Sequence, residues 1–445
     1  MKNYLDNLQK EIKDLICLAR EIASKNNTPV YLVGGCVRDL ILGVKNLDLD
    51  IVVEGDGIEF GEDLASTLKA KLIRHRRFGT ATVVLRHNLK IDPSTTLEDR
   101  ALSERSESNG RSRTIDIATA RRETYPQPAS LPVVTPGTLR DDLARRDFTV
   151  NAMAISITEK DFGKLIDFFS GNSDLRHKKI RVLHNLSFID DPTRMLRAIR
   201  FEKRYNFEIE SRTLHYLKEA VRLKMLEKVE PQRLRDELIL VLKEEQPLKQ
   251  IKRIQKLIGF GFVNPHLRIL KNTYKLLNAI RNQIGWFEKI YARRRQIDTW
   301  LIYFMGLIYS LNINEVKAAC KKFVFRKGEE KRILNCRKVS SRVMRQLSRD
   351  KIKPSKIFDL LEPLSYELIL LLKAKSKNVY VQEHIEDFFE IYNGMRIQTC
   401  GDDLHRLGIR PGPQYQKIFL RVLKAKLNGL VETKEEELAL INKMI

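Results

Sequence analysis

The spacing of apolar residues divides the chain into a first part with short strands and a second part that is helical almost throughout. In the first part, compact apolar runs such as 49–53 stand between glycine-rich and charged segments, which is typical of strands. Before them, apolar residues at helical spacing over 1–27 predict one amphipathic helix. Beyond about residue 155, helical spacing dominates. The pattern predicts an α+β protein, with a small mixed sheet and helices on one side, followed by an all-helical region.

Within the first part, the pattern predicts further elements that matter for a binding site. They are helices over 36–42 and 57–72, strands over 73–87 and 115–120, a loop with four prolines over 121–142, a strand or buried helix over 143–157, and a hairpin over 165–183. Residues 92–113 are polar and rich in Ser, Arg and Glu, with almost no apolar periodicity. That composition predicts a flexible insertion.

The charge of the chain favours a polyanionic partner. Its 81 Lys and Arg outnumber its 57 Asp and Glu, for a formal net charge of +24. Such an excess is typical of proteins that bind nucleic acid or an acidic membrane surface. The five cysteines lie far apart without metal-ligand spacing, so we expect no zinc site and reduced thiols in the cytoplasm. No apolar run reaches the roughly 18 residues that a membrane helix needs, and we expect no secretory signal.

The strongest chemical signal lies between Val33 and Glu54. Gly34 and Gly35 follow an apolar run and precede a short helix. Glycine at this position lets the backbone approach a phosphate chain, and the helix N-terminus offers free N–H groups. Arg38, one turn into the helix, adds a fork of donors. This arrangement is typical of a site for a nucleoside triphosphate.

Two carboxylates begin the apolar run that follows. Asp48 and Asp50 are two residues apart on an expected strand, so their side chains point to the same face. Adjacent carboxylates repel each other, and a divalent cation between them removes that cost. Oxygen ligands of this kind suit Mg²⁺, which is the cofactor we predict, with Asp48 and Asp50 as its ligands. Asp116, on the strand expected at 115–120, is a third carboxylate of this site, its support, or a strand-end side chain that faces water.

The ordered combination G-G-x-V-R-D-x-x-L-G followed by D-x-D resembles the signature of the polymerase-β-like nucleotidyltransferases. More narrowly, it resembles the family of class II tRNA nucleotidyltransferases and bacterial poly(A) polymerases. Residues 145–152 match the R-R-D-F-T-x-N-A motif of that family. The resemblance covers nearly the whole chain and is strongest over 31–240. It implies a nucleotide site that includes Gly34, Gly35, Arg38, Arg146, Asp147 and Asn151, with Asp48, Asp50 and Asp116 as the catalytic carboxylates.

A second informative segment is the helix expected within 187–207, whose start Asp190 or Asp191 can cap and Pro192 suits. Asp191, Arg194, Arg197 and Arg200 recur there at every third residue, which places them along one face. By itself this stripe could be an ordinary solvated face. It also resembles the E-D-x-x-R element of the family, with Asp190 where Glu is usual. The resemblance implies that Asp191 and Arg194 select the base of the incoming nucleotide, with Arg197 and Arg200 in the same site.

The resemblance implies a division of the chain into four parts: a catalytic polymerase-β-like head over 1–155, a neck with the nucleotide-selecting helix over 156–250, a helical body over 251–345, and a helical, tRNA-binding tail over 346–445. The triplet Phe78-Gly79-Thr80 is the F-G-T of the tRNA enzymes, where poly(A) polymerases carry another pattern. The loop at 121–142 is full length, and the family associates its loss with enzymes that add only CC.

These features predict a Mg²⁺-dependent transferase that builds or repairs the CCA end of tRNA. It would transfer AMP from ATP, and CMP from CTP, to the tRNA 3′-hydroxyl without a template and release pyrophosphate. We expect it to bind the acceptor and TΨC arms of tRNA and no membrane. An enzyme that adds only the terminal A is a serious alternative. A poly(A) polymerase and a catalytically silent RNA-binding protein are disfavoured, the first by the F-G-T triplet and the second by the intact aspartate pair.

Overall fold

The computed structural model describes residues 4–5, 8–44, 48–76, 79–85, 114–291 and 296–444. The chain forms two compact units, Met1–Val229 and Glu230–Ile445. The first holds a sheet with helices, and in its described residues the second is helical. This arrangement confirms the predicted α+β class. The finer boundaries expected near residues 155, 250 and 345 stay predictions.

The first unit is built on a mixed sheet in the order β3-β4-β5-β2-β1-β8-β9, as far as the described residues go. Its strands are β1 Val30–Val33, β2 Leu49–Val53, β3 Lys71–His75, β4 Thr80–Val84, β5 Thr114–Thr119, β8 Ala154–Ser156 and β9 Leu165–Ile166. The adjacent strands β2 and β5 run parallel, and the other pairs are antiparallel. The parallel pair brings together segments that are distant in sequence.

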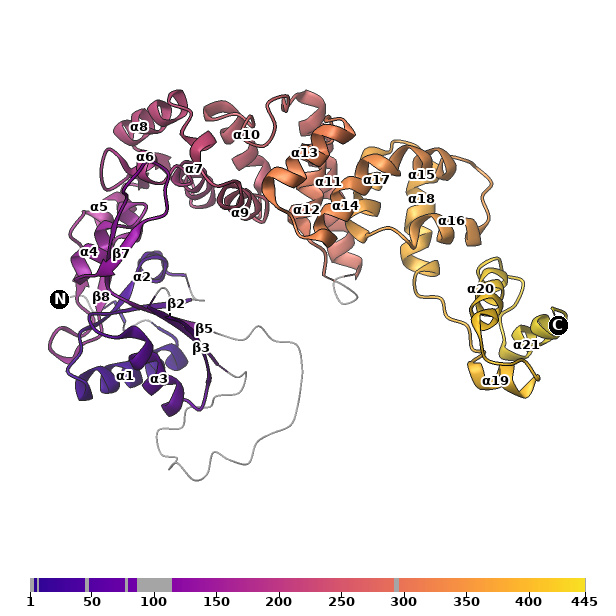
Figure 1. Ribbon diagram of the computed structural model, residues 1–445, viewed down its shortest axis with the longest axis horizontal. Coiled ribbons are helices and arrows are strands. Elements are labelled where there is room, and N and C mark those ends of the chain that lie inside the picture. Colours follow the sequence, from indigo (N-terminus) through magenta and orange to yellow (C-terminus); the bar gives the residue numbers. More distant parts are fainter. Residues whose placement is uncertain are drawn as a thin grey trace. The chain divides into compact units, whose positions relative to one another are not determined.

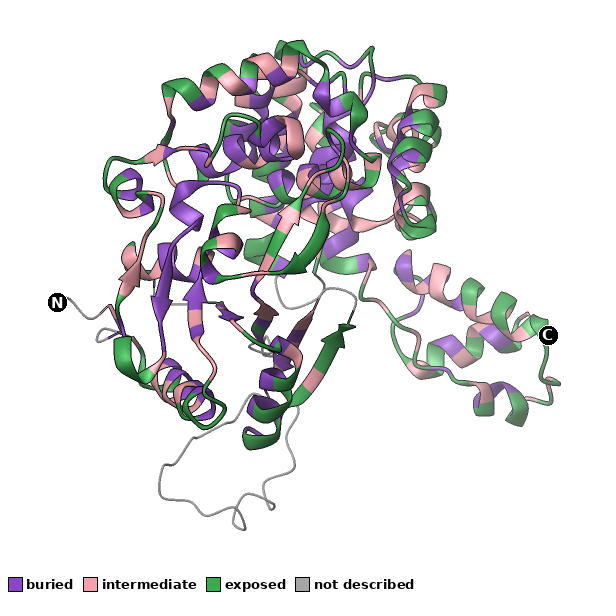
Figure 2. Ribbon diagram, turned by 60° about the vertical axis from the view of Figure 1, so that its left-hand side comes forward, coloured by how far each residue is buried: buried purple, intermediate pink, exposed green. Residues whose placement is uncertain are grey.

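Burial follows the position of each strand in the sheet. The central strands β1, β2 and β8 carry mostly buried residues, whereas the edge strand β3 is largely exposed (Figure 2). Helix α3 (Gly57–Thr67) packs across β2 to β5 and against α1 (Lys10–Lys25), as Figure 1 shows. Asp56 caps α3 by accepting from the first free N–H groups. Both helices bury an apolar stripe, which is the amphipathic pattern that the sequence displays.

Several local predictions need correction. The N-terminal helix begins at Lys10 in the described residues, and Tyr4 and Leu5 lie in a turn. The single strand predicted over 73–87 is instead two antiparallel strands, β3 and β4. Gly79, at φ 59°, lies in the turn that reverses the chain there. Apolar alternation continues on both sides of this turn, so the pattern alone could not show the reversal.

The loop predicted over 121–142 also contains regular structure. Strands β6 (Arg121–Thr124) and β7 (Val133–Pro136) form an antiparallel hairpin, and α4 (Leu139–Ala144) follows it. Thr138 begins α4 with a capping box, which local spacing could have revealed.

The hairpin predicted over 165–183 is wrong. Strand β9 pairs with β8, and β10 (Lys179–Ile180) pairs with β11 (Glu208–Ile209). Helix α5 (Gly171–Arg176) separates the two strands, because the carboxylate of Asp167 accepts from the N–H groups of its first residues.

The helix expected around Asp191 consists of two helices, α6 (Ser187–Asp190) and α7 (Arg194–Arg204). Asp191 stands between them and accepts hydrogen bonds from the N–H and Oγ1 of Thr193. Helix α8 (Ser211–Arg222) completes the first unit.

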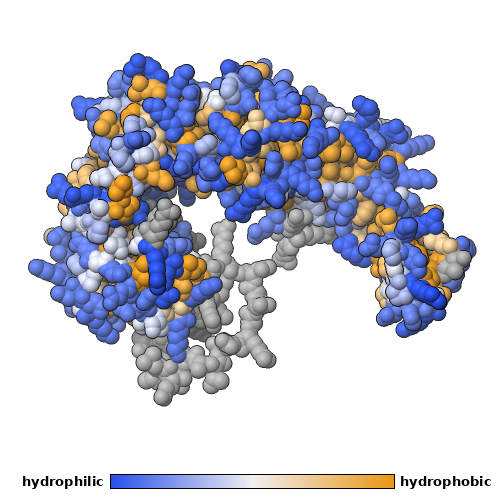
Figure 3. All heavy atoms as spheres, in the orientation of Figure 1, coloured by the Kyte–Doolittle hydropathy of each residue, from blue (hydrophilic) through white to orange (hydrophobic). Residues whose placement is uncertain are grey.

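The second unit is a succession of helices. Their bounds are α9 Pro231–Leu242, α10 Pro247–Leu257, α11 Lys271–Tyr291, α12 Thr299–Leu307, α13 Ile313–Phe323, α14 Lys327–Lys338, α15 Ser340–Leu347, α16 Pro354–Leu361, α17 Tyr366–Lys375, α18 Val379–Asp387, α19 Gly401–Arg406, α20 Pro413–Leu427 and α21 Lys434–Asn442. Its visible face is mainly hydrophilic, with apolar side chains in small groups (Figure 3). No described helix is both long enough and apolar enough to cross a membrane.

We predict that Gly171→Ala loosens the segment that precedes β8. A Cβ on Gly171 would lie 2.1 Å from the carbonyl oxygen of Thr149 and 2.9 Å from Cγ of Met153. Backbone must therefore move, and overpacking of this kind costs about 1–3 kcal/mol. Hydrogen–deuterium exchange should show faster exchange over residues 148–176.

Ser173→Ala is the matched control, because Ser173 is exposed on the same helix. It should leave the exchange unchanged. Equal protection in both variants would show that the Gly171 contact is not needed for the packing of α5 on this segment.

Candidate nucleotide and metal site

The glycine pair forms the tight connection from β1 to α2 (Gly35–Ile41). Gly34 has φ 70°, in the left-handed region that favours glycine, and its N–H donates to the carbonyl of Met153. A Cβ on Gly34 would lie 2.2 Å from Nη1 of Arg146. Glycine is therefore favoured here by its positive φ, and a side chain would also displace the end of the Arg146 guanidinium from the turn.

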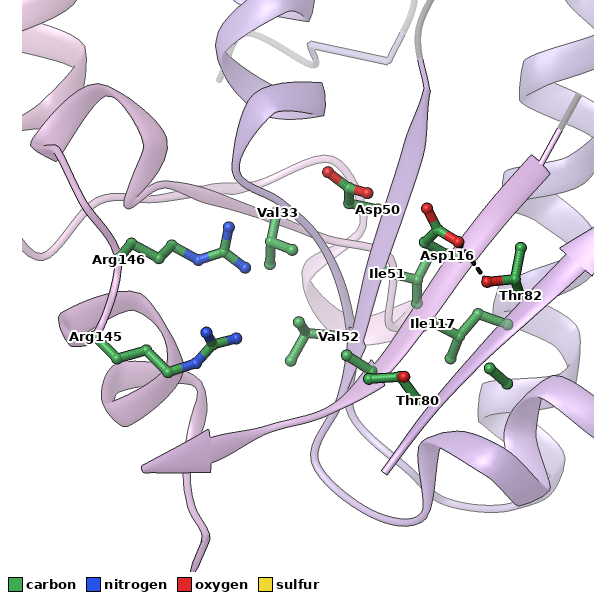
Figure 4. A pocket seen from close by; sticks show the side chains of 12 residues that line it. Val33, Asp50, Ile51, Val52, Thr80, Thr82, Asp116, Ile117, Arg145 and Arg146 are labelled. Atoms are coloured by element: carbon green, nitrogen blue, oxygen red, sulfur yellow. Dashed lines mark hydrogen bonds between the residues drawn. The ribbon is translucent and has the colours of Figure 1, made fainter. Parts of the chain in front are cut away.

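Asp50 and Asp116 lie side by side on two adjacent parallel strands. They are register partners on β2 and β5, and both line a pocket of about 250 Å³. Figure 4 shows Arg145 and Arg146 extending from the opposite side toward the strands that carry the two aspartates. The pocket therefore brings a pair of carboxylates and a pair of guanidinium groups together, as a site for a metal-bound polyanion would.

The pKa of Asp50 is raised to about 6. Burial is the largest cause, Arg146 opposes it, and the carboxylates of Asp116 and Asp48 raise the pKa further. Asp48 lies just before β2 and is exposed. The structure thus places Asp116 and Asp48 within electrostatic range of Asp50.

These residues fit a Mg²⁺ ion. Their donors are carboxylate oxygens, and burial together with the neighbouring carboxylates raises the pKa of Asp50, so a cation would make its ionisation easier. Thr82 Oγ1 donates to Oδ1 of Asp116 at 2.7 Å and so fixes that carboxylate. The described part of the chain holds no compact group of three His, Cys, Asp or Glu side chains suited to a metal. A small number of protein ligands is usual where substrate phosphates complete the coordination of Mg²⁺.

A buried carboxylate orients the two arginines. Asp142 has no exposed surface, and its two oxygens accept from Arg145 at 2.6 Å and from Arg146 at 2.9 Å. Burial alone would raise the pKa of Asp142, but the charges of Arg146 and Arg145 outweigh burial and lower it. Glu123, on β6, accepts a further hydrogen bond from Arg145 at 3.1 Å. Arg146 is therefore held over the glycine turn in one direction.

Four predicted nucleotide-binding residues form a buried chain of polar contacts. Arg38 donates to Oδ1 of Asn151, Asn151 Nδ2 donates to Asp147 at 2.9 Å, and Arg197 donates to the other oxygen of Asp147 at 2.6 Å. The chain connects α2, the 3₁₀ turn Thr149–Asn151 and α7. These contacts occupy groups that the sequence assigns to the nucleotide. They favour a supporting role beneath the pocket.

Arg38 shows this most clearly. It is 6% exposed, it also donates to Asp39 at 2.8 Å, and its guanidinium lies 4.6 Å from the ring centroid of Tyr205. Such a paired and stacked guanidinium has few directions left for a phosphate. Direct contact between Arg38 and a triphosphate stays a prediction.

The arginine stripe on α7 is not a solvated face. Arg194 and Arg200 are 4% and 7% exposed. Arg194 donates to Oγ of Ser187 at 2.7 Å and to the carbonyl oxygen of Arg145 at 2.8 Å. Arg200 lies 4.8 Å from the ring centroid of Phe201. The alternative of an ordinary surface stripe is therefore wrong for Arg194 and Arg200, and Arg194 touches the segment that carries Arg145 and Arg146.

The sequence analysis missed Asp142, Glu123, Thr82 and Tyr125. Tyr125 donates to Glu123 at 3.2 Å, and burial, partly opposed by Arg194, raises its pKa to about 12. A signal for Asp142 existed, because it precedes Arg145 and Arg146 by three and four residues, the spacing at which helical side chains meet. Thr82 and Tyr125 join the site only through strand pairing and loop packing, which no local pattern encodes.

Comparison with known proteins agrees with this geometry. A family model for the poly(A) polymerase head domain matches residues 30–181. The A-adding tRNA nucleotidyltransferase of Geobacter sulfurreducens is 36% identical, over 94% of this chain and 45% of that protein. The A-adding enzyme of Halalkalibacterium halodurans is 30% identical, over 94% of this chain and 89% of that protein. The chain thus spans less than half of the first relative and most of the second.

A solved structure of the Thermotoga maritima CCA-adding enzyme in complex with tRNA has a TM-score of 0.69 and 32% identity, and the match covers 99% of this chain and 97% of that one. The chain belongs to the family of class II tRNA nucleotidyltransferases. Two sequence features that bear on its place in the family, Phe78 and the insertion at 92–113, lie outside the described residues.

We predict that Asp142→Asn destabilises the first unit by about 3–5 kcal/mol near neutral pH, because Arg145 and Arg146, whose side chains are only 18% exposed, lose the charge of this buried carboxylate. The lowered pKa of Asp142 sets the pH dependence. Its stabilisation is complete above the ordinary carboxyl pKa of about 4 and is lost as the pH falls through the folded-state pKa. The difference between wild type and variant should therefore shrink in acid, which urea unfolding at several pH values measures.

Asp141→Asn is the control, since the neighbouring Asp141 pairs on the surface with the 62%-exposed Arg122. It should cost no more than about 1 kcal/mol. A loss of stability as small as this in Asp142→Asn would contradict the role of Asp142 in holding Arg145 and Arg146.

Proposed function

We propose that the protein transfers AMP from ATP to the 3′-hydroxyl of tRNA ending in CC and releases pyrophosphate. The observation that carries the proposal is the pocket in which Asp50 and Asp116 oppose Arg145 and Arg146. Carboxylates on one side and fixed guanidinium groups on the other suit a metal-bound triphosphate. The relatives at 36% and 30% identity are A-adding enzymes, which supports ATP as the nucleotide.

Mg²⁺ would be held by Asp48 and Asp50, with Asp116 beside them. When bound, it supplies charge neutralisation to the reacting phosphate oxygens and lowers the pKa of the attacking hydroxyl. Arg146, aimed by Asp142 over the Gly34 turn, would bind the triphosphate, with Gly35 leaving space for its approach. Transfer then rests on positioning and electrostatic stabilisation, as phosphoryl chemistry generally does.

Asp191 and Arg194 would select the base. A carboxylate accepts from the exocyclic amine of adenine or cytosine, and a guanidinium donates to a ring nitrogen, whereas uracil and guanine present the opposite pattern. The contact from Arg194 to the carbonyl of Arg145 supports this role, because it ties the base-selecting segment to the triphosphate-binding one. Arg197 and Arg200 would hold α7 in place.

The RNA partner is supported by charge. The net charge of +24 favours a polyanion, and the solved relative is in complex with tRNA. Binding to the acceptor and TΨC arms through their shape and backbone would be strongly salt-dependent. The division of the chain into head, neck, body and tail belongs to this proposal.

Addition of CMP is a second candidate, because the Thermotoga maritima relative that spans the whole chain is a CCA-adding enzyme. Incubation with tRNA ending before C74, after C74 and after C75, with labelled CTP or ATP separately, decides between the two. Incorporation of AMP after C75 alone would identify an A-adding enzyme. Incorporation of CMP on the two shorter substrates would identify a CCA-adding enzyme, and no incorporation on any of them would overturn the proposal.

We predict that Asp48→Ala and Asp50→Ala each abolish AMP incorporation while tRNA affinity stays nearly unchanged, because the carboxylates serve the metal and not the RNA. Single-turnover incorporation and filter binding measure the two quantities. Asp161→Ala, which removes a surface carboxylate paired with Lys164, is the control and should be fully active. Activity of an Asp48 or Asp50 variant within about tenfold of wild type, roughly 1.4 kcal/mol of barrier, would refute the assignment.

We predict that Asp191→Ala weakens base discrimination. Loss of the acceptor leaves the base amine unpaired in a closed pocket, which costs about 1–3 kcal/mol. Discrimination against UTP and GTP should therefore shrink by roughly 10–100-fold. Values of kcat/KM for all four nucleotides on tRNA ending in C75 test this, with the exposed Glu219 on α8, as Glu219→Gln, for comparison. Unchanged nucleotide ratios in Asp191→Ala would exclude base selection by this residue, even in an active enzyme.

A further inference from the structure

The second unit contains a cavity that the proposed reaction does not use. Helices α11, α12 and α17 pack against one another (Figure 1), and a cavity of about 760 Å³ lies among them. Its walls come from the first half of α11, the end of α12, and the end of α17 with the residues that follow. This volume is within the range of small-molecule sites, and most of the lining residues have polar or charged side chains.

The lining is charged with one sign only. It includes Lys275, Lys373, Lys375 and Lys377, and no Asp or Glu. Within the described residues, Lys275 and Lys377 have no carboxylate partner, and Lys375 donates to the hydroxyl of Tyr309 instead of to an acid. Lysines gathered around a concave surface without counter-charges repel one another. A bound anion would relieve that repulsion.

Lys373 is the buried lysine among those that line the cavity. It is 2% exposed, and its Nζ lies 3.3 Å from the ring centroid of Trp286 and 2.7 Å from a carboxylate oxygen of Glu386. Burial is the main cause that lowers the pKa of Lys373, with Glu386 opposing it. Lys373 is therefore held by contacts within the protein. Lys275, Lys375 and Lys377 also line the cavity, and their ammonium groups can donate to a ligand.

A separate observation indicates a hydrogen-bond donor on the ligand. Gln283 also lines the cavity, and its Oε1 is buried without a hydrogen-bond partner in the described chain. A buried acceptor left unpaired is unfavourable, and a hydroxyl or amine of a ligand would satisfy it once the side chain turns toward the cavity. Sulfate has no hydrogen-bond donor at neutral pH, whereas the sugar and base of a nucleotide carry hydroxyl and amine donors.

We propose that this cavity binds a small polyphosphorylated molecule that also carries a donor group, such as a nucleoside polyphosphate, at a second site distinct from the pocket of the first unit. Lys275, Lys375 and Lys377 would bind the phosphates, and Gln283 would accept from the sugar or base. A concave site of this size encloses a small ligand, whereas an RNA duplex presents its phosphates along an extended backbone and cannot enter it.

The two tryptophans of the chain give a selective signal. Both Trp286 and Trp300 lie in the second unit, so tryptophan fluorescence does not report on the nucleotide pocket of the first. Trp286 lies under Lys373, next to the cavity. Titration of the full chain with inorganic tripolyphosphate, and then with ATP after correction for its absorbance, should change the fluorescence saturably, and Trp286→Phe should lose most of the change.

The test variant is the pair Lys375→Gln and Lys377→Gln, and the matched control is Lys327→Gln with Lys331→Gln. The control lysines are exposed on α14, outside the lining, and remove the same charge. We expect the cavity variant to weaken both probes by at least about tenfold, as loss of charge-assisted contacts does, and the control to stay within about twofold.

Gln283→Leu provides a second variant with no change of charge. It should weaken ATP more than tripolyphosphate, because the sugar and base of ATP add hydroxyl and amine donors that tripolyphosphate lacks. The absence of a saturable signal, or equal weakening by both lysine pairs, would overturn the proposal. The proposal would also be overturned if neither probe bound and the Lys375 and Lys377 variant instead lost affinity for an acceptor-arm minihelix. That result would show that the lysines contact RNA. None of these outcomes depends on nucleotide transfer in the first unit.

Discussion

The site of the first unit depends on the ion pairs that the buried carboxylate of Asp142 makes with Arg145 and Arg146. A fully buried carboxylate is stable as an anion only beside cations, and Arg145 and Arg146 supply them at 2.6 and 2.9 Å. The same contacts fix the directions of both guanidinium groups. Arg146 then lies against Gly34, where a side chain would displace its guanidinium. Charge compensation in the interior thus contributes to the shape of the pocket beside the glycine turn.

A second buried network carries this order across elements. Arg38, Asn151, Asp147 and Arg197 hold α2, the 3₁₀ turn and α7 together by successive charge-assisted contacts. Each interior polar group is satisfied by the next, so removal of any one would leave a buried charge or amide unpaired. The family motif that contains these residues is therefore explained in part by folding. The side chains that line the pocket, among them Asp50, Asp116, Arg145 and Arg146, are in place to meet the phosphates of a nucleotide.

How much of this could be predicted depends on the distance over which each feature is encoded. Strand β2 has the predicted bounds because the apolar run of Leu49–Val53 is local, and the carboxylate pair at its start is visible in the same residues. Asp50 and Asp116 are neighbours because of the parallel register of β2 and β5, which no local spacing specifies. The burial of Arg194 likewise depends on packing against the segment of Arg145. Tertiary contacts thus decide which of the polar residues in the motifs face the pocket.

The excess of positive charge takes two physical forms in this protein. In the first unit, arginines are paired with buried carboxylates, which hold the planar guanidinium donors in fixed directions suited to recognising a defined ligand. In the cavity of the second unit, Lys373 is paired with Glu386, whereas Lys275 and Lys377 have no carboxylate partner among the described residues, so their charge is compensated only by solvent ions or by a ligand. Guanidinium groups held in fixed directions give a defined hydrogen-bonding geometry. Uncompensated ammonium groups attract anions through an electrostatic interaction that salt screens. Net charge alone therefore could not distinguish the two, since only the partners of each cation tell whether it serves the fold, the reaction or a further ligand.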